Sequence, residues 1–119
     1  MRPRIREITL TRGGELEDFC PSDNVNFHTA VRAIVGIDGE QDGEEAFDFS
    51  VCTPAWLASE AERRGYYFVR RQLLVPHWDP DIIRKAIKDF VAPLSGDSWG
   101  DIAGELGKVS TWEFENYEA

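Results

Sequence analysis

The side chains of this 119-residue chain that are best suited to catalysis or metal binding are two histidines and two cysteines. His28, His77, Cys20 and Cys52 do not form the closely spaced pairs that zinc ligands require. The sequence also lacks the lysine-containing glycine loop that cradles phosphate groups. We therefore expect no catalytic residues, no metal site and no cofactor.

Carboxylates are the other abundant reactive groups, and they concentrate in two stretches. The chain has 22 acidic and 13 basic residues, which gives a formal net charge of −9. Residues 38–45 contain five acids and residues 113–118 contain three. Clustered carboxylates attract a basic protein and accelerate its association. The candidate partner-binding acids are Asp38, Glu40, Asp42, Glu44, Glu45, Glu113 and Glu115.

The charge balance also excludes classes of partner. Affinity for nucleic acids and anionic membranes depends on clustered lysine and arginine. Here the first twelve residues carry a net charge of +3, but the other 107 residues carry a net charge of −12. No apolar run is long enough to cross a bilayer, and early charges interrupt any signal-peptide core. We predict a cytoplasmic protein with reduced cysteines that binds neither nucleic acid nor membrane. The oligomeric state is left open.

Tryptophans are potential contact residues because buried aromatic side chains anchor many interfaces. Trp56 and Trp99 fall on the apolar faces of expected helices and are assigned to packing. Core packing is also the expected role of the aromatic residues in the 111–117 tail. Trp78 lies in a proline-flanked connector with no apolar stripe around it, so we predict an exposed contact there.

Strands and helices that could position these residues are separated by glycine and proline. Strands are expected at residues 4–11, 27–37 and 46–52, with the acidic stretch 38–45 as an exposed hairpin loop. Residues 15–26 have the composition of a loop. A fourth strand is expected at 66–75, but charged residues interrupt its alternation, which indicates an edge strand or a functional surface.

Helix starts are marked by residues that can cap the first turn. Thr53, Asp79 and Ser98 each precede a helical pattern, which predicts helices over 54–64, 80–95 and 98–106. The second helix has an apolar stripe that includes Ile82 and Leu94. Residues 111–117 alternate aromatic and acidic types like a strand. The expected fold is one α+β domain over residues 1–119, with a mainly antiparallel sheet of four or five strands and two or three helices on one face.

Two stretches resemble the immunity protein 8 family, whose members accompany polymorphic toxins of bacteria. They are the run Val51-Cys52-Thr53-Pro54-Ala55-Trp56-Leu57 and the ending Trp112-Glu113-Phe114-Glu115-Asn116-Tyr117. The resemblance begins near residue 27, and the N-terminal third matches no known pattern. It implies an antidote that occludes the active site of a cognate toxin. Together with the negative charge, it favours a basic toxin domain, with nucleases among the candidates.

Two other classes of function remain open on the sequence. An acidic nucleic-acid mimic would capture a nucleic-acid-binding protein without having a dedicated toxin, and rescue of cells that express a neighbouring toxin gene would separate it from an immunity protein. A small-molecule-binding domain or enzyme would require an enclosed pocket with convergent polar groups.

Overall fold

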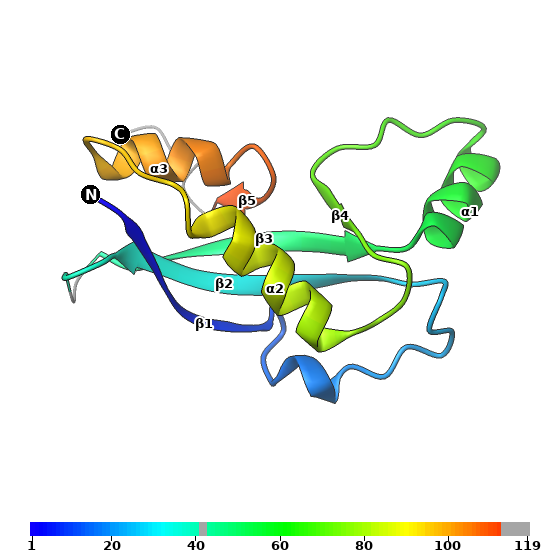
Figure 1. Ribbon diagram of the computed structural model, residues 1–119. Helices are drawn as coiled ribbons and strands as arrows, with labels where there is room; N and C mark the ends of the chain where they lie inside the picture. Colours follow the sequence, from blue (N-terminus) through cyan, green and yellow to red (C-terminus); the bar gives the residue numbers. More distant parts are fainter. Residues whose placement is uncertain (41–42, 113–119) are drawn as a thin grey trace.

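The computed structural model describes residues 1–40 and 43–112 and has an α+β fold (Figure 1). Its strands are β1 (Pro3–Leu10), β2 (His28–Ile37), β3 (Glu45–Cys52), β4 (Gln72–Leu74) and β5 (Thr111–Trp112). Its α-helices are α1 (Pro54–Arg64), α2 (Pro80–Val91) and α3 (Trp99–Leu106), and a 3₁₀ turn, η1, spans Leu16–Asp18. The expected class, the first three strands and the three helix starts are confirmed.

One mainly antiparallel sheet organises the molecule. Its order is β1-β2-β3-β4, and β5 also pairs with β3. Because β2 occupies one edge of β3, the two short strands share the other edge. β4 pairs in parallel with residues 50–52 and β5 pairs antiparallel with residues 47–48. The β2–β3 hairpin therefore pairs with β1, β4 and β5, which come from three different parts of the chain.

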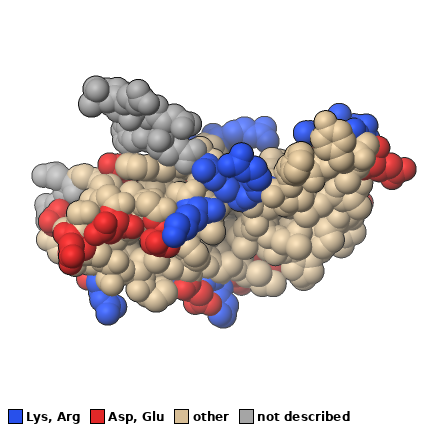
Figure 2. All heavy atoms as spheres, turned by 90° about the horizontal axis from the view of Figure 1, so that it is seen from above, with Lys and Arg blue, Asp and Glu red and all other residues tan. Residues whose placement is uncertain are grey.

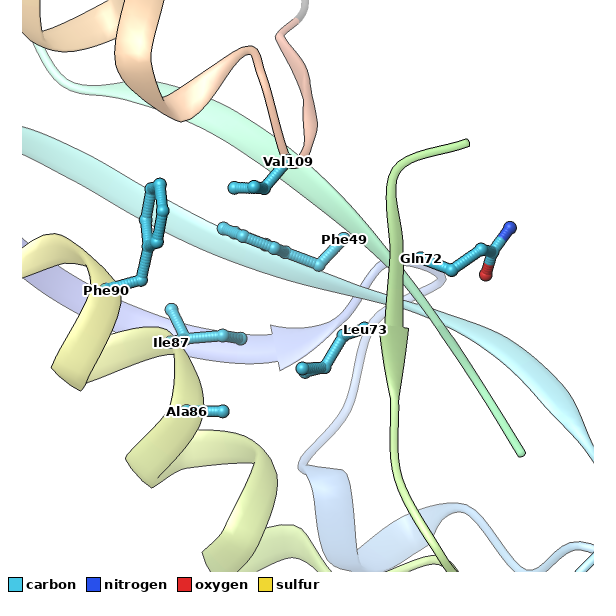
Figure 3. Close-up of a pocket in the computed structure, with 7 residues that line it drawn as sticks. All are labelled: Phe49, Gln72, Leu73, Ala86, Ile87, Phe90 and Val109. Atoms are coloured by element: carbon cyan, nitrogen blue, oxygen red, sulfur yellow. The ribbon is translucent and has the colours of Figure 1, made fainter. Parts of the chain in front are cut away.

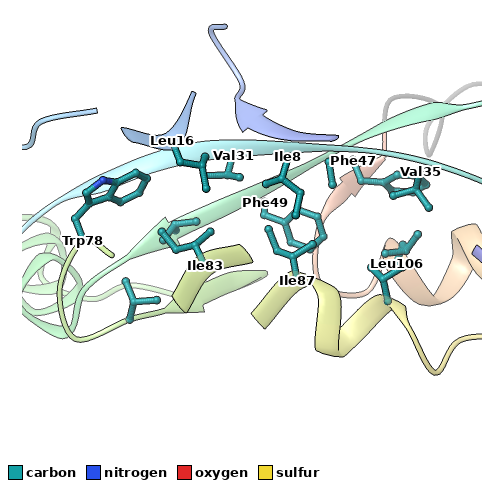
Figure 4. Packing of buried hydrophobic residues seen from close by; sticks show 14 of the residues in the cluster. Ile8, Leu16, Val31, Val35, Phe47, Phe49, Trp78, Ile83, Ile87 and Leu106 are labelled. Carbon is teal, nitrogen blue, oxygen red and sulfur yellow. The ribbon is translucent and has the colours of Figure 1, made fainter. Parts of the chain in front are cut away.

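The core lies between one face of this sheet and the helices α2 and α3 (Figures 1 and 4). Alternate residues of β2 and β3 point into it, as the period-two pattern requires. The buried side chains that form it include Val31, Val35, Phe47, Phe49, Ile83, Ile87, Ile102 and Leu106. These residues fix the hairpin and the two helices relative to one another.

Capping explains where the helices begin. The Thr53 hydroxyl accepts the Trp56 backbone N–H at 3.4 Å, and the Asp79 carboxylate accepts those of Asp81 and Ile82. Ser98 and Asp101 form a reciprocal capping box at the start of α3. These local hydrogen bonds satisfy N–H groups that the helices cannot satisfy themselves.

The structure corrects two expectations about the second helix. α2 ends at Val91 and does not continue to the glycine at position 96, because Pro93 follows directly after the cap residue Ala92. Ile82 was expected in the apolar stripe but is 38% exposed. The core contacts come from Ile83, Ile87 and Val91.

The region between α1 and α2 differs most from expectation. α1 lies at one end of the molecule and contributes no buried residue, although Trp56 and Leu57 were expected to face a core (Figure 1). The strand predicted at 66–75 is reduced to Gln72–Leu74, and residues 66–70 have no regular structure. Within the strand expected at 111–117, only Thr111–Trp112 is described.

Candidate partner-binding surfaces

The acidic turn, residues 38–45, joins β2 to β3 at the end of the sheet opposite α1 (Figure 1). Asp38 and Glu40 are exposed, and Gly39 takes a left-handed backbone with φ of 90°. Asp42 lies outside the described residues. The expected exposed hairpin connection is therefore present, with two carboxylates facing solvent in its described part.

The other two described acids of the turn are held by contacts within the chain. Glu44 pairs with Arg6 at 2.8 Å and with Arg4 at 3.8 Å, and the Arg4 guanidinium donates to the Glu40 backbone carbonyl at 2.9 Å. Glu45 begins β3 and its carboxylate accepts the indole N–H of Trp112. The arginines of β1 thus partly neutralise the negative charge of the turn. The spacing of these residues in the sequence did not indicate this pairing.

Trp78 is not an exposed contact. Its side chain is 9% exposed and packs edge to face against Phe19 and Phe27, with ring centroids 4.7 and 5.5 Å away. Phe19 follows the η1 turn, and Phe27 directly precedes β2. The expected exposure was wrong because Phe19, the nearer of the two rings, comes from the irregular 15–26 loop, where no periodicity marks core residues. Glu113 and Glu115 lie outside the described residues.

An exposed aromatic surface lies at the other end of the molecule. We define the aromatic segment as residues 66–74, which contains Tyr66, Phe68, Val69 and Leu74 with exposed fractions of 70%, 83%, 53% and 52%. The interrupted alternation of residues 66–75 had indicated an edge strand or a functional surface, but none of these residues was among the expected site residues. The available signal was the unbroken apolar run at 66–69 followed by two arginines, which departs from strand alternation.

A basic cleft separates the aromatic segment from α3. It has a volume of about 540 Å³ and its lining includes Arg70, Arg71, Lys108 and Trp112. Figure 2 looks onto the side where α3 and the aromatic segment lie, and it shows basic side chains in the middle of this face beside a row of acidic ones. Three cationic side chains therefore lie together on a chain of negative net charge, and one of them, Lys108, pairs with Glu105 at 2.9 Å.

A small apolar pocket opens between α2 and the sheet. It encloses about 170 Å³ and is lined mainly by Phe49, Leu73, Ile87, Phe90 and Val109 (Figure 3). Gln72 supplies a polar group at its edge, but its amide oxygen accepts from the Ser50 hydroxyl at 2.8 Å. The pocket thus lacks the convergent polar groups that usually orient a small ligand.

The uncovered face of the sheet carries polar pairs that satisfy one another. Arg32 and Asp48 form a bidentate pair at 2.8 and 3.0 Å. His28 contacts the Ser50 hydroxyl at 2.5 Å and stacks on Trp56 with centroids 4.5 Å apart. Burial lowers the pKa of His28 below its ordinary value of 6.5, so the neutral ring is favoured.

Two reactive residue types take structural roles. Residues 96–100 read Gly-Asp-Ser-Trp-Gly, the spacing of a nucleophilic serine elbow, although no such motif and no catalytic residue was expected from the sequence. Residues 92–97, directly before Ser98, form no strand, and the Ser98 hydroxyl caps α3 by accepting the Asp101 N–H at 3.2 Å. Cys52 is a buried free thiol whose pKa is raised by burial, so the nucleophilic thiolate is disfavoured.

Within 1–40 and 43–112, no group of three His, Cys, Asp or Glu side chains could hold a metal ion. No helix in this part of the chain combines the length and apolar character needed to cross a membrane.

Comparison with known proteins gives one match. The family model described as Immunity protein 8 matches residues 4–117, nearly the whole chain. This extends the similarity into the N-terminal third, where the sequence had suggested none. No curated protein and no solved structure matches the chain.

Proposed function

The chain belongs to the immunity protein 8 family, and from that premise we propose that it binds a cognate bacterial toxin domain and neutralises it by covering the toxin's active site. The match over residues 4–117 carries this proposal. In this proposal the chain acts in the cytoplasm as an inhibitor and catalyses no reaction of its own. The contact surface, and not a catalytic centre, then decides its specificity.

Long-range charge supports a basic toxin as the partner. A net charge of −9 attracts a positively charged domain from a distance and raises the rate of encounter. The exposed Asp38 and Glu40 of the acidic turn contribute to this field, and Asp42, Glu113 and Glu115 are proposed to add to it. The proposal assigns these acids to steering, because exposed charges mainly affect association rates.

Occlusion is consistent with the surfaces that the chain presents. Its described pockets are an apolar recess of about 170 Å³ and open clefts on the surface. Proteins that inhibit by occlusion need complementary contact area, and an interface of standard size covers about 800 Å² on each partner. A chain with a described surface of 7322 Å² has room for such an interface at either end.

The test is neutralisation of the toxin domain encoded beside the gene for this chain. Cells that express this toxin should survive when the chain is co-expressed, and the purified chain should form a stable complex with a catalytically inactive toxin variant. An unrelated toxin domain serves as the control. A wild-type chain that neither rescues the cells nor binds the inactive toxin contradicts the proposal.

A further inference from the structure

The aromatic segment exposes more large apolar side chains than any other described part of the molecule. Four of the seven exposed large hydrophobic residues lie within it: Tyr66, Phe68, Val69 and Leu74. Burying a phenylalanine side chain stabilises a fold, so the fold forgoes this stabilisation here. Groups of exposed large apolar side chains mark many interaction sites.

Ring contacts hold the aromatic segment in a defined shape. Tyr66 and Phe68 pack edge to face, with centroids 6.2 Å apart. Tyr67 lies under the Arg64 guanidinium at 4.7 Å and against the Trp56 ring at 6.1 Å, and Trp56 in turn stacks on a side chain of β2. A surface ordered before binding loses less conformational entropy when a partner covers it.

The backbone is constrained at both ends of the segment. Gly65 adopts a left-handed conformation with φ of 89° at the end of α1. Arg71 has φ of 51°, an uncommon value for a residue with a side chain, directly before the residues of β4 that pair with β3. Such a conformation persists only when its surroundings enforce it, and it is common at binding sites.

Charge defines the chemistry of the occupant. Arg70, Arg71 and Lys108 line the cleft, Lys108 pairs with Glu105 at 2.9 Å, and Arg70 follows the apolar run at residues 66–69 directly in the sequence. Tyrosine and arginine are the residues most often found at the energetic centre of protein interfaces. The complementary surface is apolar and bordered by carboxylates. A polyanion or an anionic membrane fits poorly, because the net charge of −9 repels both.

On the basis of the proposed function, we infer that the aromatic segment is the surface that anchors the toxin, and that it receives an apolar recess of the toxin bordered by carboxylates. Tyr66 and Phe68 enter the recess, and Arg70 meets the bordering acids. The acidic turn at the opposite end of the sheet steers the encounter but does not hold the complex. A basic toxin is compatible with this arrangement, because steering depends on its overall charge and anchoring on one local recess.

The decisive experiment measures the affinity of an inactive variant of the neighbouring toxin domain for single variants of the chain. Phe68→Ser should weaken binding by about thirtyfold or more, mainly through faster dissociation, as expected at the centre of an interface. Arg70→Glu should also weaken it. Matched controls are Val25→Ser, which alters another exposed apolar residue, and Lys88→Glu, which reverses a charge on exposed α2 surface. Both should bind as the wild type does.

The outcomes separate this inference from the proposed function. If the wild type binds the toxin and Phe68→Ser binds equally well, the inference is overturned and the proposed function stands. Failure of the wild type to bind contradicts the proposed function itself. The unfolding temperature of every variant should match that of the wild type, because each of the four substituted side chains is exposed, Phe68 to 83%.

A second copy of the chain is the competing occupant. Sedimentation of the wild type should give a monomer at micromolar concentration. A dimer that Phe68→Ser converts to a monomer would overturn the inference in favour of self-association. Faster dissociation caused by acidic-turn variants, with no effect of Phe68→Ser, would overturn it in favour of the acidic end.

Discussion

The two ends of the sheet use their conspicuous residues in opposite ways. At the acidic end, carboxylates that look available in the sequence are engaged inside the chain, because Glu44 pairs with Arg6 and Glu45 accepts from Trp112. At the aromatic end, side chains that look like strand interior are exposed, and Phe68 reaches 83% exposure. Residue type alone therefore does not show which side chains remain available to a partner. A side chain is available to another protein only when contacts within the fold do not already engage it.

The largest expected difference between the ends concerns two phenylalanines. Phe47 is fully buried and packs against Trp99 and Trp112, with centroids 6.1 Å away in each case. Phe47→Ala should lower the free energy of unfolding by about 3–5 kcal/mol. Phe68→Ser should change it by less than about 0.5 kcal/mol. Urea denaturation of both variants measures the contrast, and a similar loss at both positions would mean that the aromatic end belongs to the core.

The next effect concerns steering by the acidic end. Changing Asp38 and Glu40 together to lysine should slow association with a basic toxin about tenfold at low salt and leave dissociation unchanged. The difference should disappear as salt screens the charges. Glu62→Lys with Asp89→Lys is the control, since it makes the same change in net charge elsewhere. Equal slowing by both double variants would show that only total charge matters.

A smaller effect should follow from releasing Glu44. Arg6→Gln removes the cation 2.8 Å from its carboxylate and makes the acidic turn more negative. Association with a basic toxin should become faster at low salt, while stability falls by at most about 1 kcal/mol, because the pair is partly exposed. Arg12→Gln removes an arginine outside the turn for comparison. Stopped-flow association rates that do not distinguish the two variants would contradict local steering.

The smallest expected effect is a pH dependence at the aromatic end. Burial keeps the folded-state pKa of His28 below 6.5, with the Glu60 charge opposing the shift. The unfolded chain therefore binds more protons as pH falls below about 6.5, so stability should decrease until the folded-state pKa is reached. His28→Gln should flatten the profile of unfolding free energy against pH. An unchanged profile in His28→Gln would assign the pH dependence elsewhere.

Features that depend on neighbours in sequence could be predicted, and those that depend on distant partners could not. The helix starts at Thr53, Asp79 and Ser98 follow from hydrogen bonds that span two or three residues. The β2–β3 hairpin follows from alternation around a glycine-containing turn. By contrast, the burial of Trp78 depends on Phe19, which lies in a loop that has no periodicity.

The candidate surfaces show the same division. The sequence identified the position of the acidic turn, but the pairing of Glu44 with arginines of β1 is a contact across nearly forty positions that spacing does not encode. The aromatic segment has apolar composition, and composition alone favours burial. Its exposure results from α1 lying beyond the end of the sheet, so that no core forms beneath residues 66–70.

Residues 54–71 leave the sheet after β3 and return at β4, and none of their side chains is buried. Substitutions, insertions and deletions in this stretch would therefore leave the interior of the protein undisturbed. If the toxin binds the aromatic segment as we propose, recognition can change without a loss of folding stability, because different residues serve the two requirements. A lineage that faces a succession of altered toxins would then adapt its inhibitor by exchanging residues 54–71 alone.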